Sequence, residues 1–351
     1  GLFEHPFALT GSALSEMVHH PEDELITLQS ALESLVLLKN DNHVLPVGKN
    51  VRKIALIGPH ADNARHFFGG YTHLSMVEAI HAVMNSLAGV DASNTERKPM
   101  LTVPGTQVQS DETEEFAQIG RQIKPDCPSL LAKLTSSLPD AEITYAYGYP
   151  IAGADESHFA EALQAAAGAD LVILTLGGKH GSGSVATMGE GVDATDINLP
   201  RCQDAFIRAA ANLHKPMIGI HFGGRPISSD AADECLDAIL EAWNPSEMGA
   251  EALTRVLTGE TAPSGRMPVT TARSAGQIPV YYNHPNGSSW HQGDSIGFQE
   301  YVDMPHRPRY YFGQGLSYTT FAYDGLRIDK EEVGPREEIT VSCQVTNTGS
   351  R

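Results

Sequence analysis

The chain has 351 residues, of which 41% are apolar, so it is long enough for one large domain or two smaller ones with hydrophobic cores. Its formal net charge of −19 argues against nucleic acid or an anionic membrane surface as the main partner. No stretch is long and apolar enough to span a bilayer. These properties are compatible with an enzyme that acts on a neutral substrate, without identifying one.

Helix-like and strand-like segments alternate along the first 260 residues. Apolar residues spaced by three and four predict helices at residues 21–38, 75–88, 111–123, 155–168, 201–213 and 247–257. Short apolar runs predict buried strands at residues 53–57, 143–146, 171–175, 217–221 and 238–240. Within the first helix, four leucines are expected on one face: Leu25, Leu28, Leu32 and Leu35.

This alternation predicts an α/β fold with a mostly parallel sheet. Strands that are apolar on both faces need helices on both faces to cover them. In sheets of this kind, ligands bind beyond the carboxyl ends of the strands. We therefore expect the chemistry in the loops that follow strands.

The pattern changes after residue 260. Residues 261–321 are rich in Pro, Gly, Asn, His and Tyr and show no helical spacing, and their aromatic residues predict an ordered, packed excursion. Residues 326–328 and 339–345 alternate with period two, which predicts strands. A β-sandwich needs about 100 residues, so only its first strands fit into residues 322–351.

A long glycine-rich loop, residues 176–193, follows the strand at 171–175. Glycine allows positive φ angles and a close approach of the backbone to a ligand. The loop fits neither a phosphate-binding P-loop, nor a dinucleotide-binding fingerprint, nor a nucleophile elbow, because the order and spacing of its residues differ. On local grounds alone, a lone Glu such as Glu190 between Gly189 and Gly191 is more typical of a solvated surface loop than of a catalytic one.

A series of short motifs runs in a fixed order through almost the whole chain. They stand at residues 1–6, 34–40, 45–46, 54–62, 198–200, 224–226, 263–268, 277–282 and 312–321, and include GLFEHP, VLLKN, IALIGPHAD, GRP and FGQGLSYTTF. Each is weak alone. In this order they resemble the C-terminal part of family 3 glycoside hydrolases of the β-glucosidase and β-xylosidase type.

The resemblance implies a retaining mechanism with two carboxylates. In that family a barrel domain supplies an Asp nucleophile, and a loop of the second domain supplies a Glu acid/base, commonly in a Gly-Glu-Gly-x-Asp-Arg context ten residues before a proline. Glu190 stands ten residues before Pro200 and is therefore the expected acid/base. The chain departs from the pattern at Ala194, where Arg is common. This departure puts in doubt the ion pair that would orient the loop.

The nucleophile is expected outside this chain, because no Asp here stands in a setting that resembles the barrel motif. The implied partners are a β-glycoside substrate and an N-terminal barrel domain of the same enzyme, and the isolated chain is expected to be inactive. We expect three parts: a linker and helix leaving the barrel at 1–40, an α/β domain at 41–321, and a truncated fibronectin type III-like domain at 322–351.

Three further side chains are candidates for contact with substrate. Lys179 and His180 would hydrogen-bond sugar hydroxyls, or be solvated loop residues. Trp290 would stack on a sugar ring, or pack within its loop. Asp193 and Asp196 are expected to form turns or caps rather than to take part in the chemistry.

No metal or organic cofactor is expected. The fifteen histidines form no H-E-x-x-H motif, and the four cysteines form no C-x-x-C pair and are expected as free thiols, although a bridge between Cys127 and Cys202 stays open. The chain opens at Gly1 without an initiator Met or a signal peptide, so both ends are expected to be cuts in a longer polypeptide, with any localisation signal outside this chain. The compartment, cytoplasmic or secreted, and a homodimer as against a monomer are left open.

Two rival functions remain. The same domain would also suit a non-catalytic carbohydrate-binding or interaction protein, which a start codon directly before Gly1 would favour. A nucleotide-binding α/β protein would bind ATP or NAD, which we expect this chain not to do.

Overall fold

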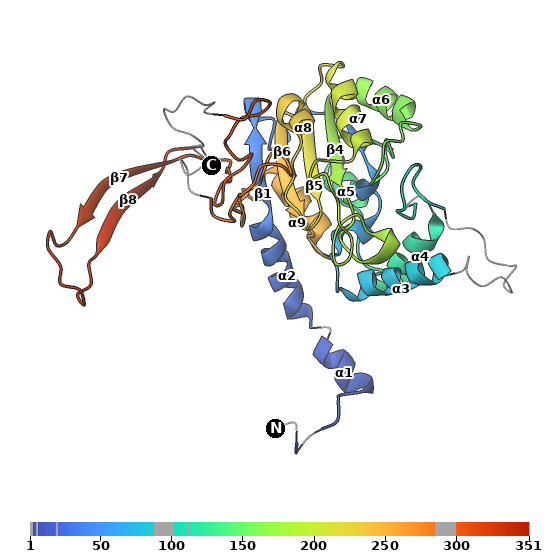
Figure 1. Cartoon of the computed structure of the whole chain (residues 1–351), viewed down its shortest axis with the longest axis horizontal. Coiled ribbons are helices and arrows are strands. Elements are labelled where there is room, and N and C mark those ends of the chain that lie inside the picture. Colours follow the sequence, from blue (N-terminus) through green and yellow to red (C-terminus); the bar gives the residue numbers. More distant parts are fainter. Residues whose placement is uncertain are drawn as a thin grey trace, which may run out of the picture.

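The structure is a computed structural model that describes residues 3–4, 6–18, 20–87, 101–110, 113–284 and 300–350. Its centre is a six-stranded sheet in the order β1-β6-β5-β4-β2-β3 (Figure 1). The strands are β1 Val36–Asn40, β2 Lys53–Ile57, β3 Glu142–Ala146, β4 Leu171–Gly177, β5 Met217–Phe222 and β6 Ala238–Trp243. Only β1 runs antiparallel to its neighbour, and the other pairs are parallel. The predicted mostly parallel α/β sheet is confirmed.

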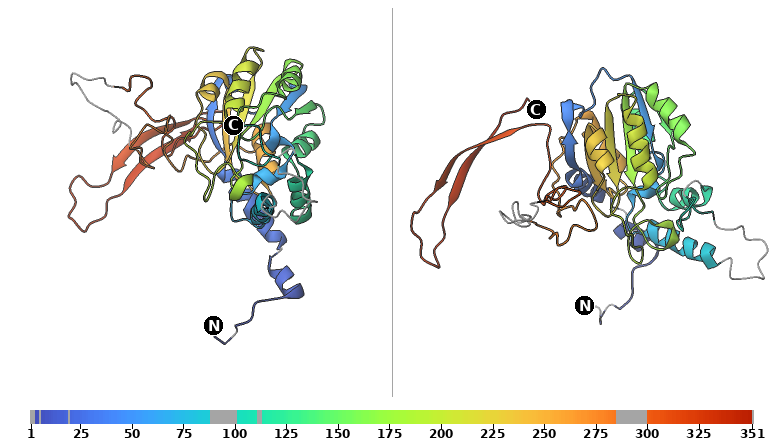
Figure 2. Two further views of the ribbon diagram at one scale, coloured as in Figure 1. Left: turned by 45° about the vertical axis from the view of Figure 1, so that its right-hand side comes forward. Right: turned by 45° about the horizontal axis from the view of Figure 1, so that its top comes forward.

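Helices cover both faces of the sheet (Figure 2). One core lies between the sheet and helices α2 Pro21–Ser34, α5 Leu130–Ser137 and α9 Gly249–Thr258. The other lies against α6 Phe159–Ala167, α7 Arg201–Ala211 and α8 Asp230–Cys235. Successive strand residues alternate between the cores, as Leu56 and Ile57 do, because side chains of a strand point to opposite faces. Every residue of β4 and β5 is buried, which explains why their sequences are apolar apart from Thr175 and His221.

The strand order places a topological switch point between β2 and β4. Strand β3 pairs with one edge of β2. The chain then returns through α6, and β4 pairs with the other edge of β2. The loops that leave β2 and β4 therefore diverge, and ligands of open α/β sheets bind at such a point. The glycine-rich loop that holds Glu190 begins here, at the end of β4.

The prediction of a helix at residues 21–38 is wrong for residues 35–38. Helix α2 ends at Ser34, and the following residues form β1, in which Leu37 pairs with Leu240 of β6. Pairing across the sheet satisfies backbone groups that a longer helix would otherwise satisfy internally. Leu28 and Leu32 are buried as expected, whereas Leu25 is 72% exposed.

The remaining helices lie near their predicted positions or were missed. Helices α3 His73–Leu87 and α4 Glu114–Ile123 match their predictions, and Asp111, the expected cap of α4, lies outside the described residues. Helices α5 and α8 were not predicted, nor was α1 Gly11–Val18, in which no residue is buried. Four short 3-10 helices were also missed: η1 Asp41–His43, η2 Pro59–Ala61, η3 Ala64–Phe67 and η4 Gly183–Val185.

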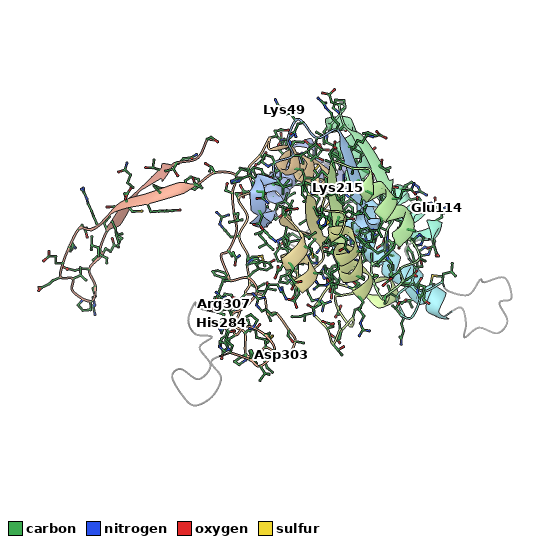
Figure 3. All side chains as sticks on the ribbon, turned by 90° about the horizontal axis from the view of Figure 1, so that it is seen from above. Lys49, Glu114, Lys215, His284, Asp303 and Arg307 are labelled. Carbon is green, nitrogen blue, oxygen red and sulfur yellow. The ribbon has the colours of Figure 1, made fainter. Side chains whose placement is uncertain are left out.

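The excursion at residues 261–320 contains no helix or named strand within its described parts, 261–284 and 300–320. In Figure 3, His284, Asp303 and Arg307 of this excursion lie on the opposite side of the molecule from Glu114 of α4. The expected packing of its aromatic residues holds for Tyr310, which is 6% exposed, but not for Tyr281 or Phe312, which are 61% and 52% exposed. Trp290 lies outside the described residues.

The last two strands form a separate hairpin. Strands β7 Phe321–Ile328 and β8 Val341–Asn347 pair antiparallel and extend away from the α/β part (Figure 1). All residues of β8 are exposed. Such a pair is consistent with the start of a fibronectin type III-like sandwich, since two strands alone have no opposing sheet to bury their side chains against.

Candidate functional site

The loop after β4 is folded back on itself. The Thr187 amide donates to the Lys179 carbonyl over 2.9 Å, and the Gly181 amide donates to the Met188 carbonyl over 3.0 Å. The Lys179 amide in turn donates to the Thr187 hydroxyl over 3.0 Å. Met188, on the returning arm, is buried. These contacts give the loop a defined shape up to the residue before Gly189.

Glu190 stands at the tip of a tight turn. The Val192 amide donates to the Gly189 carbonyl over 3.2 Å, which closes the turn. Gly189 has φ +134°, and a Cβ on it would lie 1.8 Å from the Gly181 carbonyl oxygen, so no other residue fits this position without a shift of the backbone. The turn therefore presents the side chain of Glu190 on the outside of the loop, where it is exposed to solvent.

The Glu190 carboxylate has a defined partner in Tyr71, a residue that precedes α3. The Tyr71 hydroxyl donates to Oε2 of Glu190. This hydrogen bond raises the pKa of the Tyr71 phenol above its ordinary value, because the neutral phenol is the form that donates. Tyr71 is 71% exposed and has φ +65°, a conformation that is uncommon for a residue other than glycine. Ala194, where the family commonly has Arg, is exposed.

Lys179 faces the interior. Its Nζ donates to the Phe68 carbonyl over 2.6 Å and to the Ser75 hydroxyl over 2.9 Å, and it lies 3.4 Å from Oε2 of Glu78. The other carboxylate oxygen of Glu78 accepts from Nε of Arg65 over 2.7 Å. Burial lowers the pKa of Lys179 to about 8, and the Glu78 carboxylate opposes that shift. The geometry does not turn this ammonium toward the exposed side of the loop, and its contact with sugar remains a prediction.

His180 is half-buried beside the segment that precedes α3. Its Nδ1 accepts from the Gly70 amide over 3.3 Å and lies 3.3 Å from Nδ2 of Asn244. Burial, and then the nearby charge of Lys179, lower the pKa of His180. Since Nδ1 accepts, the neutral ring carries its proton on Nε2. Its contact with sugar remains a prediction.

A cavity of about 440 Å³ lies beside the loop, at the carboxyl ends of β4 and β5. Gly177, Gly178, Met188 and His221 contribute to its wall. Glu190 is not among the lining residues, so the carboxylate lies outside this cavity.

Two buried residues at this place were not singled out from the sequence, His221 and Glu241. Nδ1 of His221 lies 2.8 Å from Oε1 of Glu241, and the other carboxylate oxygen accepts from the Ile227 amide over 2.8 Å. Tyr71 was missed as well. The only sequence signal for His221 is a histidine within an apolar strand, and no local signal connects Tyr71 with Glu190.

Asp196 forms the turn that was expected there. Its Oδ1 accepts from the amide and from Nδ2 of Asn198 over 3.0 and 2.7 Å. The four cysteines all lie within the described residues, and none of them forms a disulfide. Among the described residues, no group of three or more His, Cys, Asp or Glu is arranged to hold a metal ion. No helix in the described ranges is long and apolar enough to cross a membrane.

Comparison with known proteins identifies relatives over the whole chain. The model of the glycosyl hydrolase family 3 C-terminal domain matches residues 35–318. A periplasmic β-glucosidase of Salmonella typhimurium is 31% identical over 358 aligned residues, which cover 100% of this chain and 42% of that protein. A β-xylosidase of Formosa agariphila is 29% identical and covers 93% of this chain and 38% of its own length.

A solved structure of another protein has the same fold over the whole of this chain. A β-glucosidase involved in saponin metabolism from intestinal bacteria superposes with a TM-score of 0.71 at 26% identity. The match covers 100% of this chain and 46% of that structure. The chain thus spans less than half of the length of these relatives.

Proposed function

Because the chain belongs to the C-terminal domain family of the family 3 glycosyl hydrolases, we propose that it is part of a glycoside hydrolase and that Glu190 is its acid/base. The reaction is the retaining hydrolysis of terminal β-linked glucose or xylose from oligosaccharides or glycosides. The nucleophile is an Asp of a barrel domain outside this chain.

The observation that carries the proposal is the presentation of Glu190. The turn of Gly189 and Gly191 places this carboxylate on the outside of the loop after β4, at the switch point of the sheet. A solvated surface Glu would need neither a glycine with φ +134° on one side nor a dedicated hydrogen-bond donor such as Tyr71. Both features fit a carboxyl group that must be held toward a second domain.

The chemistry divides between the two domains. A retaining glycosidase holds its carboxyl groups about 5 Å apart. As the Asp nucleophile attacks the anomeric carbon, Glu190 gives its proton to the departing glycosidic oxygen. In the second step the Glu190 carboxylate takes a proton from water, whose oxygen displaces the Asp and releases the sugar. The second domain would also cover the loop and exclude bulk water from the site.

The choice between glucose and xylose is left to the partner domain. The relatives include proteins named β-glucosidase and β-xylosidase. The substrate candidates Lys179 and His180 do not discriminate between these sugars, since the first is buried and the second contacts the backbone of Gly70. Both sugars therefore belong to the proposal.

The test is Glu190→Gln in the longer polypeptide that includes the barrel. Glutamine cannot donate the acid proton, so kcat/KM should fall by about 10² to 10⁴ for alkyl glycosides, the range that general acid catalysis contributes. Dinitrophenyl glycosides, whose leaving group needs no proton, should lose much less in the first step. Glu332→Gln makes the same chemical change at an exposed residue of the β7–β8 hairpin and should have no effect.

Two outcomes contradict the proposal. Equal losses on both substrates, or no loss, would assign the acid to another residue. Hydrolysis of aryl glycosides by the 351-residue chain alone would show that the nucleophile lies within it. A purely binding protein would show neither activity nor sensitivity to Glu190→Gln in any form.

A further inference from the structure

Glu190 has little to restrain its side chain within its own turn. Both neighbours are glycines, and the carboxylate is exposed. An acid/base catalyst, by contrast, has to keep one oxygen directed at the substrate within a fraction of an ångström. A group outside the turn is needed to orient the carboxylate, and within the described residues the Tyr71 hydroxyl donates a hydrogen bond to it.

The segment that carries Tyr71 is itself fixed at several points. We call residues 68–75 the anchor segment. The Phe68 carbonyl accepts from Lys179, the Gly70 amide donates to His180 over 3.3 Å, and the Thr72 hydroxyl donates to the Gly69 carbonyl over 2.8 Å. The first two contacts come from the base of the same loop that carries Glu190. The anchor segment and the acid/base loop therefore form one unit.

The glycines of the anchor segment permit this close approach. A Cβ on Gly69 would lie 3.0 Å from Nδ1 of His180, and one on Gly70 would lie 3.6 Å from Nε2 of the same ring. The imidazole thus lies directly against the backbone that leads into Tyr71. The positive φ of Tyr71 then turns its side chain out of the segment, at the cost of some backbone strain.

A buried charge cluster holds the base of this unit. Lys179, Glu78 and Arg65 are 1–2% exposed, and burying such charges is unfavourable unless they are paired. Glu78 pairs with both cations, and the remaining hydrogen bonds of the Lys179 ammonium go to the anchor segment. The cluster thereby fixes the position from which Tyr71 reaches Glu190.

We propose that Tyr71 is a positioning residue for Glu190, which it holds through a hydrogen bond to Oε2, and that Lys179 acts through the anchor segment to place Tyr71. This role rests on the proposed acid/base function of Glu190. A protonated carboxyl group has one O–H and one carbonyl oxygen. Because the Tyr71 hydroxyl donates to Oε2, the proton of the acid form is left on Oε1, from which it is given to the glycosidic oxygen.

The contact can be tested on the 351-residue chain without any activity. Tyrosine labelled with ¹³C at Cζ would report each phenol, with Tyr71 assigned from the signal lost in Tyr71→Phe. In the native chain the pKa of Tyr71 should lie above its ordinary value, and Glu190→Gln should bring it back toward that value, whereas Glu332→Gln should not. An unchanged Tyr71 titration in Glu190→Gln would overturn the inference.

The positioning role is tested in the longer polypeptide with Tyr71→Phe and Tyr323→Phe. Both residues are 71% exposed, and Tyr323 lies on the hairpin, far in sequence from the loop. Tyr71→Phe should lower kcat/KM for alkyl glycosides on the order of tenfold, the loss expected for one hydrogen bond to a charged group. The loss should fall on kcat with little change in KM, and it should be smaller for dinitrophenyl glycosides. A merely structural change would affect both substrate classes alike.

The outcomes separate this inference from the proposed function. If Glu190→Gln shows the leaving-group signature while Tyr71→Phe behaves as Tyr323→Phe does, the positioning role is wrong and the acid/base assignment stands. If Glu190→Gln shows no such signature, the assignment itself falls, whatever Tyr71→Phe does to the rate.

Discussion

Nδ1 of His221 and Oε1 of Glu241 lie 2.8 Å apart, on neighbouring strands and almost completely shielded from solvent. The carboxylate also accepts from the Ile227 amide over 2.8 Å, and thus holds the chain just after the Gly224-Arg225-Pro226 motif. His221 in turn contributes to the cavity wall beside the acid/base loop. The pair therefore connects β5 with β6 and with the loop that follows β5, at the wall of the cavity beside the acid/base loop.

Glu241→Gln should destabilise the fold by about 2–3 kcal/mol. Glutamine keeps one acceptor oxygen but turns an NH₂ group toward donors of the protein, which leaves at least one buried donor without a partner. Glu234→Gln is the matched control, since Glu234 is exposed and pairs with Arg208 at the surface over 2.7 Å. It should change the free energy of unfolding by no more than about 0.5 kcal/mol. Urea unfolding measures both, and equal effects would contradict the buried role of Glu241.

Gly189→Ala should disrupt the turn that presents Glu190, because its Cβ would collide with the Gly181 carbonyl. Gly191→Ala is a matched change two residues on, where φ is also positive but no atom lies within 4 Å of the added Cβ. It should cost only about 1–2 kcal/mol for the left-handed backbone. Hydrogen exchange at the Val192 amide, which donates to the Gly189 carbonyl, is the measurement. Protection should be lost in the first variant and largely kept in the second.

Acid should destabilise the fold through His60. Burial lowers the pKa of this histidine to about 3 from its ordinary value of 6.5, and its Nε2 lies 2.9 Å from the Gly178 carbonyl. Between about pH 3 and 6.5 the unfolded chain therefore binds more protons than the folded chain, so stability is lost as the pH falls through this window. At most this amounts to about 1.4 kcal/mol per pH unit.

The check is the pH dependence of urea unfolding in His60→Gln. Its stability should fall less steeply between pH 6.5 and 4 than that of the native chain, although His66, whose pKa burial also lowers, continues to contribute. His73→Gln, at an exposed histidine, should keep the native slope. Parallel curves for all three proteins would show that His60 is not the group responsible.

Arg309→Ala should release the excursion from the α/β part. The guanidinium is buried, donates to the Ser229 carbonyl over 3.1 Å, and pairs with Asp230 over 2.6 Å and with Asp233 of α8. Its removal takes a donor from the Ser229 carbonyl and a cation from both carboxylates, with an expected cost of about 2–3 kcal/mol, since the carboxylates stay partly open to water. Arg307→Ala removes an exposed arginine of the same segment and should be nearly neutral. Limited proteolysis of residues 300–320 should accelerate only in the first variant.

The sequence was sufficient to predict the central strands β4 and β5 because both are buried on both faces. Residues such as those of β4 and β5 form apolar runs too short for a helix, and they alternate with clear helical spacing. The loop after β4 was singled out because it combines glycines with a position after such a strand, whereas Glu190 within it was singled out by the resemblance to the family. Apolar runs, helical spacing and glycine-rich stretches are properties of short segments, so they can be recognised in the sequence without knowledge of distant contacts.

The rest depended on contacts between distant parts of the chain. Strand β1 continues the apolar spacing of α2, and only its pairing with β6 decides that Val36–Asn40 is a strand. Lys179 stands among glycines, as an exposed residue would, yet Glu78 of α3 accommodates its charge in the interior. Tyr71 reaches Glu190 across 119 residues of sequence. None of these three contacts produces a periodicity or a motif in the sequence from which it could be predicted.

The pairing of β1 has a consequence for how the protein is made. Leu37 is translated long before its partners: it pairs with Leu240 of β6, and its carbonyl accepts from the amide of Leu316 over 2.8 Å. Translation proceeds at about 5–20 residues per second, so the first of these partners leaves the ribosome roughly 10–40 s after Leu37. During that time the apolar segment Val36–Asn40 has no β6 strand to pair with. A nascent chain stalled before residue 240 should therefore depend on chaperones to keep this segment from associating with other chains.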